Sequence, residues 1–401
     1  MKALKAATLL KGEIGKRMKK RVFGYPIKKI GIIGGGQLGK MLSQKAKQMG
    51  FYVISLDPSA ACPAASVSDE LIVSDFYNPE KLKELVEKSD ITTYEIEHIN
   101  TSVLKELYDK GYNILPSPYC LEIIQDKLRQ KQVLKEAGLP VPRFKKVDSF
   151  DISFFESFGF PLVQKTTKGG YDGRGVVVIK SKDDINKVLK TESYVEEFVD
   201  IEKELAVIVA RNKKGDVVSY PVVEMVFDET ANILDMLIVP ARVEKDIEDE
   251  AKKVAIKAVE ALQGVGVFGV ELFLTKDRKV LINEIAPRPH NSGHYTIEAC
   301  ITSQFEQHLR AICDLPLGST KLLSSAVMIN LLGEDGYKGT PVIEGLEDAL
   351  SIEGVSFHFY GKKLTAPFRK MGHVTIVDDD LERAIEKAKK VKEVLKIKAE
   401  V

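Results

Sequence analysis

The N-terminal third of the chain alternates short apolar runs with amphipathic stretches. Residues 27–36 (IKKIGIIGGG) form an apolar run that ends in a glycine turn, and residues 37–49 continue with apolar side chains at helical spacing. Further apolar runs at 52–56, 71–73 and 91–94 repeat the order of strand, then helix. This alternation predicts an α/β domain built on a parallel sheet.

The pattern changes near residue 120, after Pro116 and Pro118. A helix is expected over about 119–137, and beyond it the chain is rich in β runs. The expected elements are short strands at 161–165, 175–180 and 193–199, longer strands at 204–211, 217–224, 266–275 and 279–285, and helices at 247–263 and 379–396. The expected divisions are an N-terminal extension (1–27), a parallel-sheet domain (28–120), a small lid region (121–200), a larger α+β domain (201–322) and a C-terminal β unit with a closing helix (323–401).

Length and composition favour a soluble protein of several domains. The 401 residues exceed the usual size of one hydrophobic core, and 44% hydrophobic with 29% charged residues is typical of globular chains. The formal net charge of +1 creates no long-range field for nucleic acid or a membrane surface, so an anionic substrate needs a local basic cluster. No apolar run of the sequence reaches the roughly 18 residues that span a bilayer.

Cysteine usage and the basic N-terminus bear on the cellular location. Cys62, Cys120, Cys300 and Cys313 show no CxxC spacing, which argues against a disulfide framework or a zinc site and favours a reducing cytoplasm. The first 29 residues carry ten Lys or Arg and one acid, Glu13. This segment is Lys-rich and lacks an uninterrupted apolar core, so we expect a solvated extension rather than a targeting peptide.

The segment 34–39 (GGGQLG) offers a phosphate-binding motif. It satisfies GxGxxG between an expected strand and an expected helix, and Asp57 closes the second strand, as in dinucleotide-binding sheets. Such glycines also aim a helix N-terminus at other anions, or serve a purely structural turn. NAD, a different anionic ligand and a structural role therefore all stay open for this segment.

The segment 165–175 (KTTKGGYDGRG) is more informative. Its four glycines free the backbone to wrap a polyphosphate, and Lys165, Lys168 and Arg174 add positive charge. The GKS or GKT ending of a Walker loop is missing, and an ordinary flexible hairpin is the plain alternative. The run 194–199 (YVEEFV) reads on its own as an edge strand with solvated carboxylates.

Two acidic side chains lie on consecutive expected strands. Glu271 and Glu284 flank the tight turn 276–278, and antiparallel pairing would place both carboxylates on one face. With the Asn283 amide, they offer the hard oxygen ligands that Mg²⁺ prefers beside nucleotide phosphates. Two solvated acids on a hairpin are the alternative. However, the next run, 286–294 (APRPHNSGH), concentrates Arg, His and Asn side chains in a Pro-containing loop, which favours a ligand site.

These motifs together resemble the ATP-grasp superfamily, and within it the family of 5-(carboxyamino)imidazole ribonucleotide synthases. The resemblance runs from about residue 28 to about residue 390, and its most specific parts are 34–39 (GGGQLG), 169–175 (GGYDGRG), 283–294 (NEIAPRPHNSGH) and 303–318 (SQFEQHLRAICDLPLG). It implies a mixed α/β and α+β ATP-grasp fold, with a Rossmann-like N-terminal domain, a mobile lid, a larger ATP- and Mg²⁺-binding domain and a small C-terminal β unit.

The resemblance also implies an activity and its partners. ATP and bicarbonate would react through carboxyphosphate to carboxylate the amine of 5-aminoimidazole ribonucleotide, a step of purine biosynthesis. ATP would be the co-substrate, Mg²⁺ or Mn²⁺ the metal, and a cytoplasmic homodimer the assembly. No nucleic-acid or membrane partner is expected.

By the same resemblance, ATP lies between the lid and the larger domain. The implied nucleotide-binding residues contact the phosphates, the adenine hinge and the ribose: Lys127, Lys165, Gly170, Gly173, Arg174, Gly175, Glu196, Glu197, Val199, Glu204, Asn283 and Glu284. The implied Mg²⁺ ligands are Glu271 and Glu284. The implied catalytic residues, which contact the ribonucleotide and bicarbonate, are Tyr171, Asp172, Arg288, His290, Asn291, Lys362 and Arg369. Further substrate contacts are implied for Gln37, Glu95 and Lys370.

One position departs from the family pattern. Where the family usually has Glu-Asn-x-His, this chain reads Glu224, Met225, Val226 and Phe227. A histidine that would touch the nucleotide is therefore replaced by Phe227, which puts one polar contact in doubt.

Three other functions stay open at this point. They are another ATP-grasp ligase or transformylase for a phosphorylated amine, an NAD-dependent dehydrogenase built on 34–39, and a catalytically silent nucleotide-binding regulator. The acids Glu271 and Glu284 argue against a catalytically silent regulator, and the basic glycine-rich segment 165–175 argues against the dehydrogenase.

Overall fold

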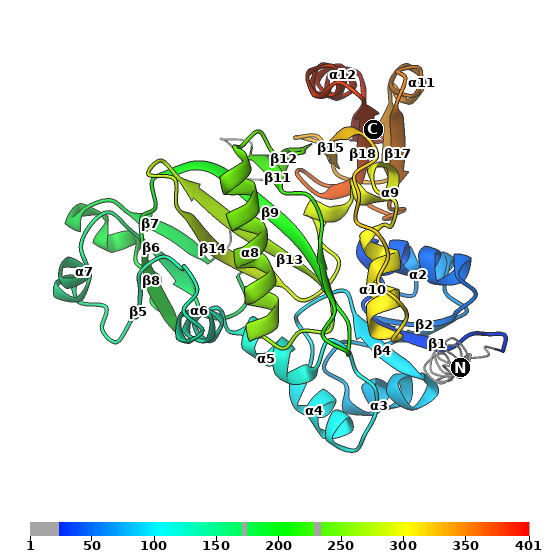
Figure 1. Ribbon diagram of the computed structural model, residues 1–401, viewed down its shortest axis with the longest axis horizontal. Coiled ribbons are helices and arrows are strands. Elements are labelled where there is room, and N and C mark those ends of the chain that lie inside the picture. Colours follow the sequence, from blue (N-terminus) through cyan, green and yellow to red (C-terminus); the bar gives the residue numbers. More distant parts are fainter. Residues whose placement is uncertain (1–23, 171–174, 228–233, 401) are drawn as a thin grey trace, which may run out of the picture.

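The computed structural model describes residues 24–170, 175–227 and 234–400. Figure 1 shows a small sheet at one end of the molecule, a large sheet in the middle, and the N-terminal and C-terminal parts of the chain on the other side. None of the helices in these described ranges has the length and apolar content to cross a bilayer. The predicted mixed α/β and α+β architecture is confirmed.

The N-terminal part is a four-stranded parallel sheet, as the alternating pattern predicted. Its strand order is β3-β2-β1-β4, and all three pairings are parallel. Gly50, at φ +84°, follows the first helix and lets the chain turn into the next strand. The elements are β1 (Lys29–Ile33), α2 (Gln37–Gln48), β2 (Tyr52–Asp57), the 3₁₀ turn Pro63–Ser66, β3 (Glu70–Val73), α3 (Pro79–Lys88), β4 (Ile91–Tyr94) and α4 (Thr101–Asp109).

The single helix expected over 119–137 is wrong, because the chain breaks at Asp126. The structure has α5 (Pro118–Gln125) and α6 (Lys127–Glu136), with Asp126 in extended conformation between them. The Asp126 carboxylate accepts a hydrogen bond from the Arg129 backbone N–H at 3.1 Å and so caps α6. This break places Lys127 at the first turn of a new helix.

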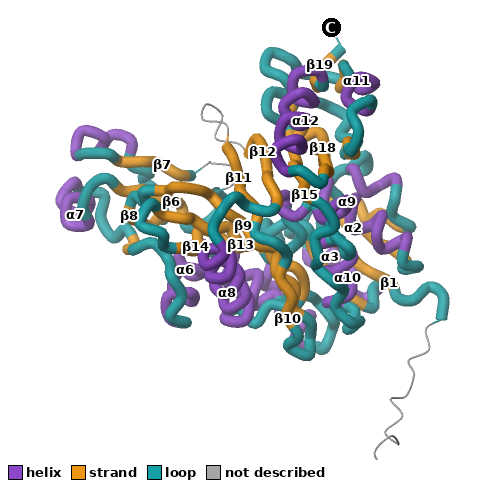
Figure 2. Tube along the Cα trace, turned by 45° about the horizontal axis from the view of Figure 1, so that its top comes forward, coloured by secondary structure: helices purple, strands orange, loops and turns teal. Residues whose placement is uncertain are grey.

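The lid region contains a four-stranded antiparallel sheet with the order β5-β8-β6-β7. A small apolar core, including the buried residues Phe155, Leu162 and Val195, holds helix α7 against it. The elements are β5 (Phe144–Lys146), α7 (Ile152–Phe158), β6 (Leu162–Thr166), β7 (Val176–Ile179), the 3₁₀ turn Lys182–Lys187 and β8 (Ser193–Glu197). Figure 2 shows this sheet at the end of the molecule opposite the C-terminal strands.

A nine-stranded sheet forms the centre, with the main order β14-β13-β9-β11-β12-β15-β18-β17 and β10 paired to β9. The strand expected over 217–224 is wrong: it is two strands, separated at Pro221, whose backbone lacks the N–H that a ladder needs. The elements of the first part are β9 (Ile201–Arg211), β10 (Val217–Ser219), β11 (Val223–Phe227), β12 (Leu234–Val239), α8 (Lys245–Ala261), β13 (Gly266–Thr275) and β14 (Val280–Ala286).

The strands of the C-terminal segment extend this same sheet, because β15 pairs with β12. The sequence predicted a small β unit over 323–401, but neither its individual strands nor their pairing with the large sheet. The closing helix expected at 379–396 is α12 (Leu381–Val394). The remaining elements are the 3₁₀ turn Asn291–Gly293, α9 (Thr296–Ala299), α10 (Gln304–Ile312), β15 (Ser325–Leu332), β16 (Pro341–Glu344), α11 (Leu346–Leu350), β17 (Val355–Phe359), β18 (Lys370–Asp378) and β19 (Lys396–Ala399), which pairs with β16.

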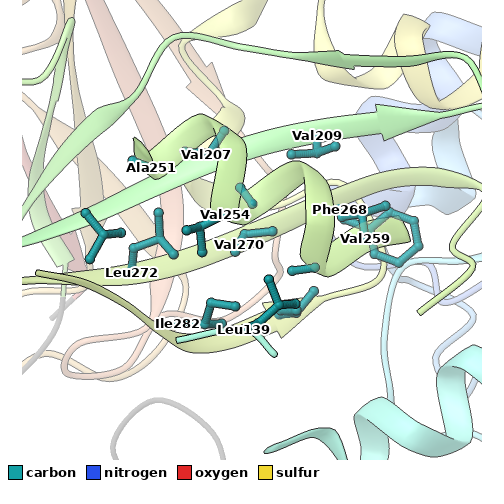
Figure 3. Close-up of a cluster of buried hydrophobic side chains, with 14 of the residues drawn as sticks. Leu139, Val207, Val209, Ala251, Val254, Val259, Phe268, Val270, Leu272 and Ile282 are labelled. Atoms are coloured by element: carbon teal, nitrogen blue, oxygen red, sulfur yellow. The ribbon is translucent and has the colours of Figure 1, made fainter. Parts of the chain in front are cut away.

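Helix α8 packs its apolar face on β9, β13 and β14 and forms the largest part of the core (Figure 3). Each fully buried aliphatic or aromatic side chain contributes about 1.5–3 kcal/mol relative to exposure, so this layer fixes the sheet rigidly. The labelled members are Leu139, Val207, Val209, Ala251, Val254, Val259, Phe268, Val270, Leu272 and Ile282. A rigid sheet here holds the side chains on its opposite face in place.

Candidate active site

A cavity of about 470 Å³ lies between the lid sheet and the large sheet. Residues from β6, β7 and β8 line one side, and residues from β9, β11, β13 and β14 line the other. Lys127, at the start of α6, and Lys370, at the start of β18, complete it. The volume falls in the range of about 300–1,000 Å³ that is typical of small-molecule sites.

The floor of the cavity carries the two predicted carboxylates side by side. Glu271 and Glu284 are direct partners in the antiparallel pairing of β13 with β14, so their side chains share one face, as the sequence predicted. Burial and the nearby charges of Glu284 and Glu204 raise the pKa of Glu271 to about 8. Such crowding of acids is relieved when a cation is bound.

Lys127 supplies one cation to this floor. Its Nζ donates to Glu284 Oε2 at 2.7 Å. Burial raises the pKa of Glu284, but the Lys127 charge outweighs it and holds the pKa below its usual range. The pair therefore stays ionised at neutral pH.

A second lysine reaches the floor from the lid. Lys165 Nζ, on β6, lies 2.6 Å from Glu196 Oε2 and donates to Asn283 Oδ1 at 3.2 Å. Lys165 therefore connects the lid strands β6 and β8 to β14, next to Glu284. Two lysines from different elements thus meet two carboxylates in one cavity, as a polyphosphate with a divalent cation requires.

The polar loop 286–294 forms the wall next to the carboxylates. Arg288 Nη2 lies 2.8 Å from Glu97 Oε1, and Arg288 Nε is buried without a hydrogen bond among the described residues. His290 Nε2 lies 3.6 Å from Glu271 Oε1. Burial, then the charges of Arg288, Lys370 and His294, lower the pKa of His290 well below its ordinary value, so its ring is neutral at pH 7.

Gln304 fixes the backbone at His290. The His290 N–H donates to Gln304 Oε1 at 2.8 Å, and Gln304 Nε2 donates to the His290 carbonyl, also at 2.8 Å. The Gln304 side chain is fully buried. The loop is therefore held by hydrogen bonds from α10, which is why an irregular segment presents its side chains in one arrangement.

Apolar side chains form a slot at the lid end of the cavity. Val163 and Val178 come from the lid, and Met225, Phe227 and Phe273 come from the large sheet. Glu204 lies beside this slot, and burial raises its pKa above the ordinary value. Apolar side chains next to a polar floor suit a nucleoside whose phosphates point at the lysines.

The glycine turn 34–36 uses its amides inside the protein. Gly35 N–H donates to Asp57 Oδ2 at 2.9 Å, and Gly36 N–H donates to Glu95 Oε1 at 2.6 Å. Burial raises the pKa of Glu95 to about 7. Two of the amides that a dinucleotide pyrophosphate would use therefore already have carboxylate partners, which argues against the dehydrogenase.

Most of the implied site residues that the structure describes line this one cavity. Those in the lining are Lys127, Lys165, Gly170, Glu196, Glu197, Val199, Glu204, Glu271, Asn283, Glu284, Arg288, His290, Asn291 and Lys370. Gln37, Glu95, Gly175, Lys362 and Arg369 are described but lie outside that lining. Tyr171, Asp172, Gly173 and Arg174 lie outside the described residues.

Sequence reasoning missed several lining residues. Glu97 and His98 enter from the loop after β4, and the apolar slot was not foreseen. The alternation of Val163 with Lys165 on β6, and of Glu271 with Phe273 on β13, could have indicated it, because residues two apart share a face of a strand. Glu97 gave no such signal, since only the tertiary fold brings it to Arg288.

Replacing Phe227 with histidine is expected to change the dissociation constant for ADP by less than about tenfold, because one added hydrogen bond is worth roughly 1 kcal/mol. Phe227 lines the cavity, so the histidine that is usual in the family would face the same space. Calorimetric titration of ADP into Phe227→His, with Phe227→Leu as the control for loss of the ring, measures the effect. If Phe227→His bound ADP much more than tenfold more tightly than the parent, the phenylalanine would be shown to weaken nucleotide binding in this chain seriously.

The site and fold together define an ATP-grasp protein, with a cavity between a lid sheet and a large antiparallel sheet. Three family models match the chain: the ribonucleotide synthetase preATP-grasp domain over residues 27–125, the ATP-grasp domain over 132–305, and the phosphoribosylaminoimidazole carboxylase C-terminal domain over 326–387. The first match covers the parallel sheet, the second covers the lid sheet and most of the large sheet, and the third covers the C-terminal strands that extend the large sheet.

The N5-carboxyaminoimidazole ribonucleotide synthase of Bacillus subtilis is 41% identical over 90% of this chain and 94% of its own length. The phosphoribosylaminoimidazole carboxylase of Vigna aconitifolia is also 41% identical, but this chain spans only 64% of that protein's length. The chain therefore belongs to the N5-carboxyaminoimidazole ribonucleotide synthase family.

Solved structures agree with this assignment. The crystal structure of N5-carboxyaminoimidazole ribonucleotide synthetase from Thermotoga maritima has a TM-score of 0.88 and 59% identity, and the match covers 93% of this chain and 100% of that chain. The synthase from Aspergillus clavatus, in complex with ADP and 5-aminoimidazole ribonucleotide, has a TM-score of 0.84 and 35% identity, over 91% and 98% of the two chains.

Proposed function

We propose that this chain uses ATP and bicarbonate to carboxylate the exocyclic amine of 5-aminoimidazole ribonucleotide, a step of de novo purine biosynthesis. The observation that carries the proposal is the cavity itself. It brings the facing acids Glu271 and Glu284, the lysines Lys127 and Lys165, and the Arg288 loop around one space. The names and bound ligands of the similar proteins support the identity of the substrates.

The proposed reaction has two steps. A bicarbonate oxygen attacks the γ-phosphorus of ATP, ADP leaves, and carboxyphosphate forms. The amine nitrogen then bonds to the carboxyl carbon, the bond from that carbon to the phosphate oxygen breaks, and phosphate leaves with that electron pair. The nitrogen loses one proton, and the product is a carbamate.

The side chains hold and neutralise these reactants, and none of them has to form a covalent bond. Lys127 and Lys165 offset the charge that develops on the phosphates, as positioned cations do in other phosphoryl transfers. Arg288 and the neutral ring of His290 would hold bicarbonate and the amine beside the phosphate. Carboxyphosphate reacts readily with water, so covering of the cavity by the lid should decide how tightly ATP use is coupled to product.

The floor residues fit the proposed Mg²⁺. Glu271 and Glu284 would hold it with the Asn283 amide nearby. Burial first, and then the charges of Glu284 and Glu204, raise the pKa of Glu271, as fits a carboxylate that a bound cation would stabilise. No group of three or more His, Cys, Asp or Glu residues suited to a metal occurs in the described part of the chain, which fits an ion whose other ligands are phosphates. When bound, Mg²⁺ would polarise the phosphate oxygens.

The remaining assignments stay proposals. We infer divisions near residues 120, 200 and 322. The limits of the three family-model matches support the first and the last, and the change from the lid sheet to the large sheet between β8 and β9 supports the division near 200. Tyr171, Asp172, Gly173 and Arg174 are proposed to cover the substrates, and Gln37 and Glu95 are proposed substrate contacts. A cytoplasmic homodimer is also proposed.

Release of ADP measures the proposed function. It should require Mg²⁺ and should rise strongly only when bicarbonate and 5-aminoimidazole ribonucleotide are both present. Equal stimulation by glycinamide ribonucleotide with formate would instead indicate a transformylase. Tight binding of NAD without binding of ATP would contradict the proposal altogether.

A further inference from the structure

Lys131 is a fully buried lysine for which the proposed reaction gives no role. Its relative exposure is 1%, and it lies one helical turn after Lys127 on α6, so both lysines are on the same face of that helix. Lys131 Nζ lies 2.9 Å from Glu196 Oε1 and donates to the Ile282 carbonyl, also at 2.9 Å. Burying an ammonium group is costly, so a lysine at this position calls for an explanation.

The Glu196 carboxylate is shared between two lysines. It is 2% exposed, with Oε1 against Lys131 and Oε2 at 2.6 Å from Lys165. Burial raises the pKa of Glu196, but the two lysine charges outweigh it and bring the pKa to about 2. Glu196 is therefore an anion at neutral pH, and both lysines are drawn to it.

Lys165 has competing partners at the cavity. Its ammonium has three donors and contacts both Glu196 and Asn283, at the place where the phosphates of ATP are proposed to lie. An ion pair in a poorly solvated site is much stronger than one in water. A carboxylate with no other cation would therefore draw the Lys165 ammonium to both of its oxygens and away from a phosphate.

We propose that Lys131 is a positioning residue: by holding one oxygen of Glu196, it leaves the Lys165 ammonium able to reach the phosphates of ATP. The inference rests on the proposed function, because it takes the phosphates to lie at Lys165. It links residues 196–199, which the family resemblance implies as the adenine hinge, to the phosphate end of the same nucleotide.

A purely structural role for Lys131 predicts something different. The same helix is also attached to β14 by Gln130, whose Oε1 accepts from the Ile285 N–H at 3.1 Å and whose Nε2 donates to the Ile285 carbonyl at 3.3 Å. Loss of a structural attachment would lower stability and weaken the binding of all substrates together. Loss of the cation on Glu196 Oε1 would weaken the binding of the nucleotide alone, and this effect would disappear once the Glu196 charge is removed.

The test compares Lys131→Met with Glu196→Gln and with the double variant Lys131→Met/Glu196→Gln. The single variant should raise the KM for ATP and the dissociation constant for ADP by about tenfold, while the KM for 5-aminoimidazole ribonucleotide stays within about twofold. The double variant should keep both nucleotide constants within about threefold of those of Glu196→Gln alone, because a neutral amide no longer attracts Lys165 and the loss of the Glu196 carboxylate itself is common to both variants. Lys131→Arg, which keeps the charge, should stay near the parent.

Lys203→Met is the matched control. Lys203 is one of two cations on the buried Glu224, at 3.1 Å, with Arg242 as the other at 2.7 Å, and it does not line the cavity. This variant should leave both nucleotide constants within about twofold of the parent.

A double variant that binds nucleotide about tenfold more weakly than Glu196→Gln alone, or an equal loss for all substrates, would overturn the proposal and leave Lys131 as a structural attachment. If Lys131→Met does not fold, the comparison of the double variant with Glu196→Gln decides, because equal ADP affinity supports the proposal and a large further loss contradicts it. ADP binding does not depend on the amine substrate. Failure of the parent chain to bind ADP would therefore count against the proposed function, whereas normal binding that is unchanged in Lys131→Met would count against this inference alone.

Discussion

Glu284→Gln is expected to lower kcat by about 1,000-fold or more while leaving the fold intact. Glu284 faces Glu271 across the strand pair and receives the Lys127 hydrogen bond at 2.7 Å, so the change removes a negative charge from the proposed Mg²⁺ site and from a lysine at the phosphates. A loss of about 4 kcal/mol of transition-state stabilisation corresponds to this factor. The glutamine keeps the shape of the side chain, which is half exposed within the cavity, so stability should change little.

The rate of ADP release at saturating substrates, measured over a series of Mg²⁺ concentrations, gives the comparison. Glu202→Gln serves as the control, because Glu202 is an exposed acid on β9 outside the cavity lining. Near-normal activity of Glu284→Gln at high Mg²⁺ would show that the carboxylate is not part of the catalytic floor. Thermal denaturation of both variants separates a catalytic loss from unfolding.

Arg369→Ala is expected to raise the KM for 5-aminoimidazole ribonucleotide by about 10-fold to 100-fold, since a charged hydrogen bond is typically worth about 1.5–3 kcal/mol. Arg369 is exposed, and its Nη1 donates to the Leu364 carbonyl at 2.9 Å. Its neighbour Lys370 lines the cavity, and Lys362 Nζ donates to the Lys370 carbonyl at 2.6 Å. Of these three basic residues only Lys370 lines the cavity, while Lys362 and Arg369 lie outside the lining next to it in the structure or the sequence. The phosphate of the ribonucleotide is proposed to bind along this basic segment.

Steady-state kinetics with each substrate varied in turn measures this effect, and the KM for ATP should change little. Arg383→Ala is the matched control, because Arg383 is a largely exposed arginine on α12 that pairs with Asp378. An unchanged KM for the ribonucleotide in Arg369→Ala would show that Arg369 does not contact this substrate. Lys370 would then be the basic contact at the cavity.

The sequence predicted the acidic floor well because its determinants are local. Glu271 and Glu284 lie on adjacent strands joined by a short turn, and the turn fixes their register. The lysines and the polar loop 286–294 were identified by composition alone. Their convergence on one cavity was expected only from the family resemblance, because no local pattern says which loops meet.

The missed features are those that tertiary contacts decide. The break at Asp126 was overlooked because the apolar spacing continues across it, although an Asp before a helical run is a known start signal. The pairing of β15 with β12 extends the large sheet and could not be read from either strand. The burial of Lys131 depends on Glu196 and Ile282, which approach it from other elements, so no pattern within α6 indicates it.

The central claim is that this cavity transfers carboxylate carbon from bicarbonate to an amine at the expense of ATP. The most direct measurement is ¹³C nuclear magnetic resonance of the reaction with ¹³C-bicarbonate, ATP, Mg²⁺ and 5-aminoimidazole ribonucleotide. The account predicts a new carbamate signal that couples to nitrogen when the amine is ¹⁵N-labelled, and that forms in step with ADP. ADP release without formation of a ¹³C carbamate bonded to the amine nitrogen would contradict it.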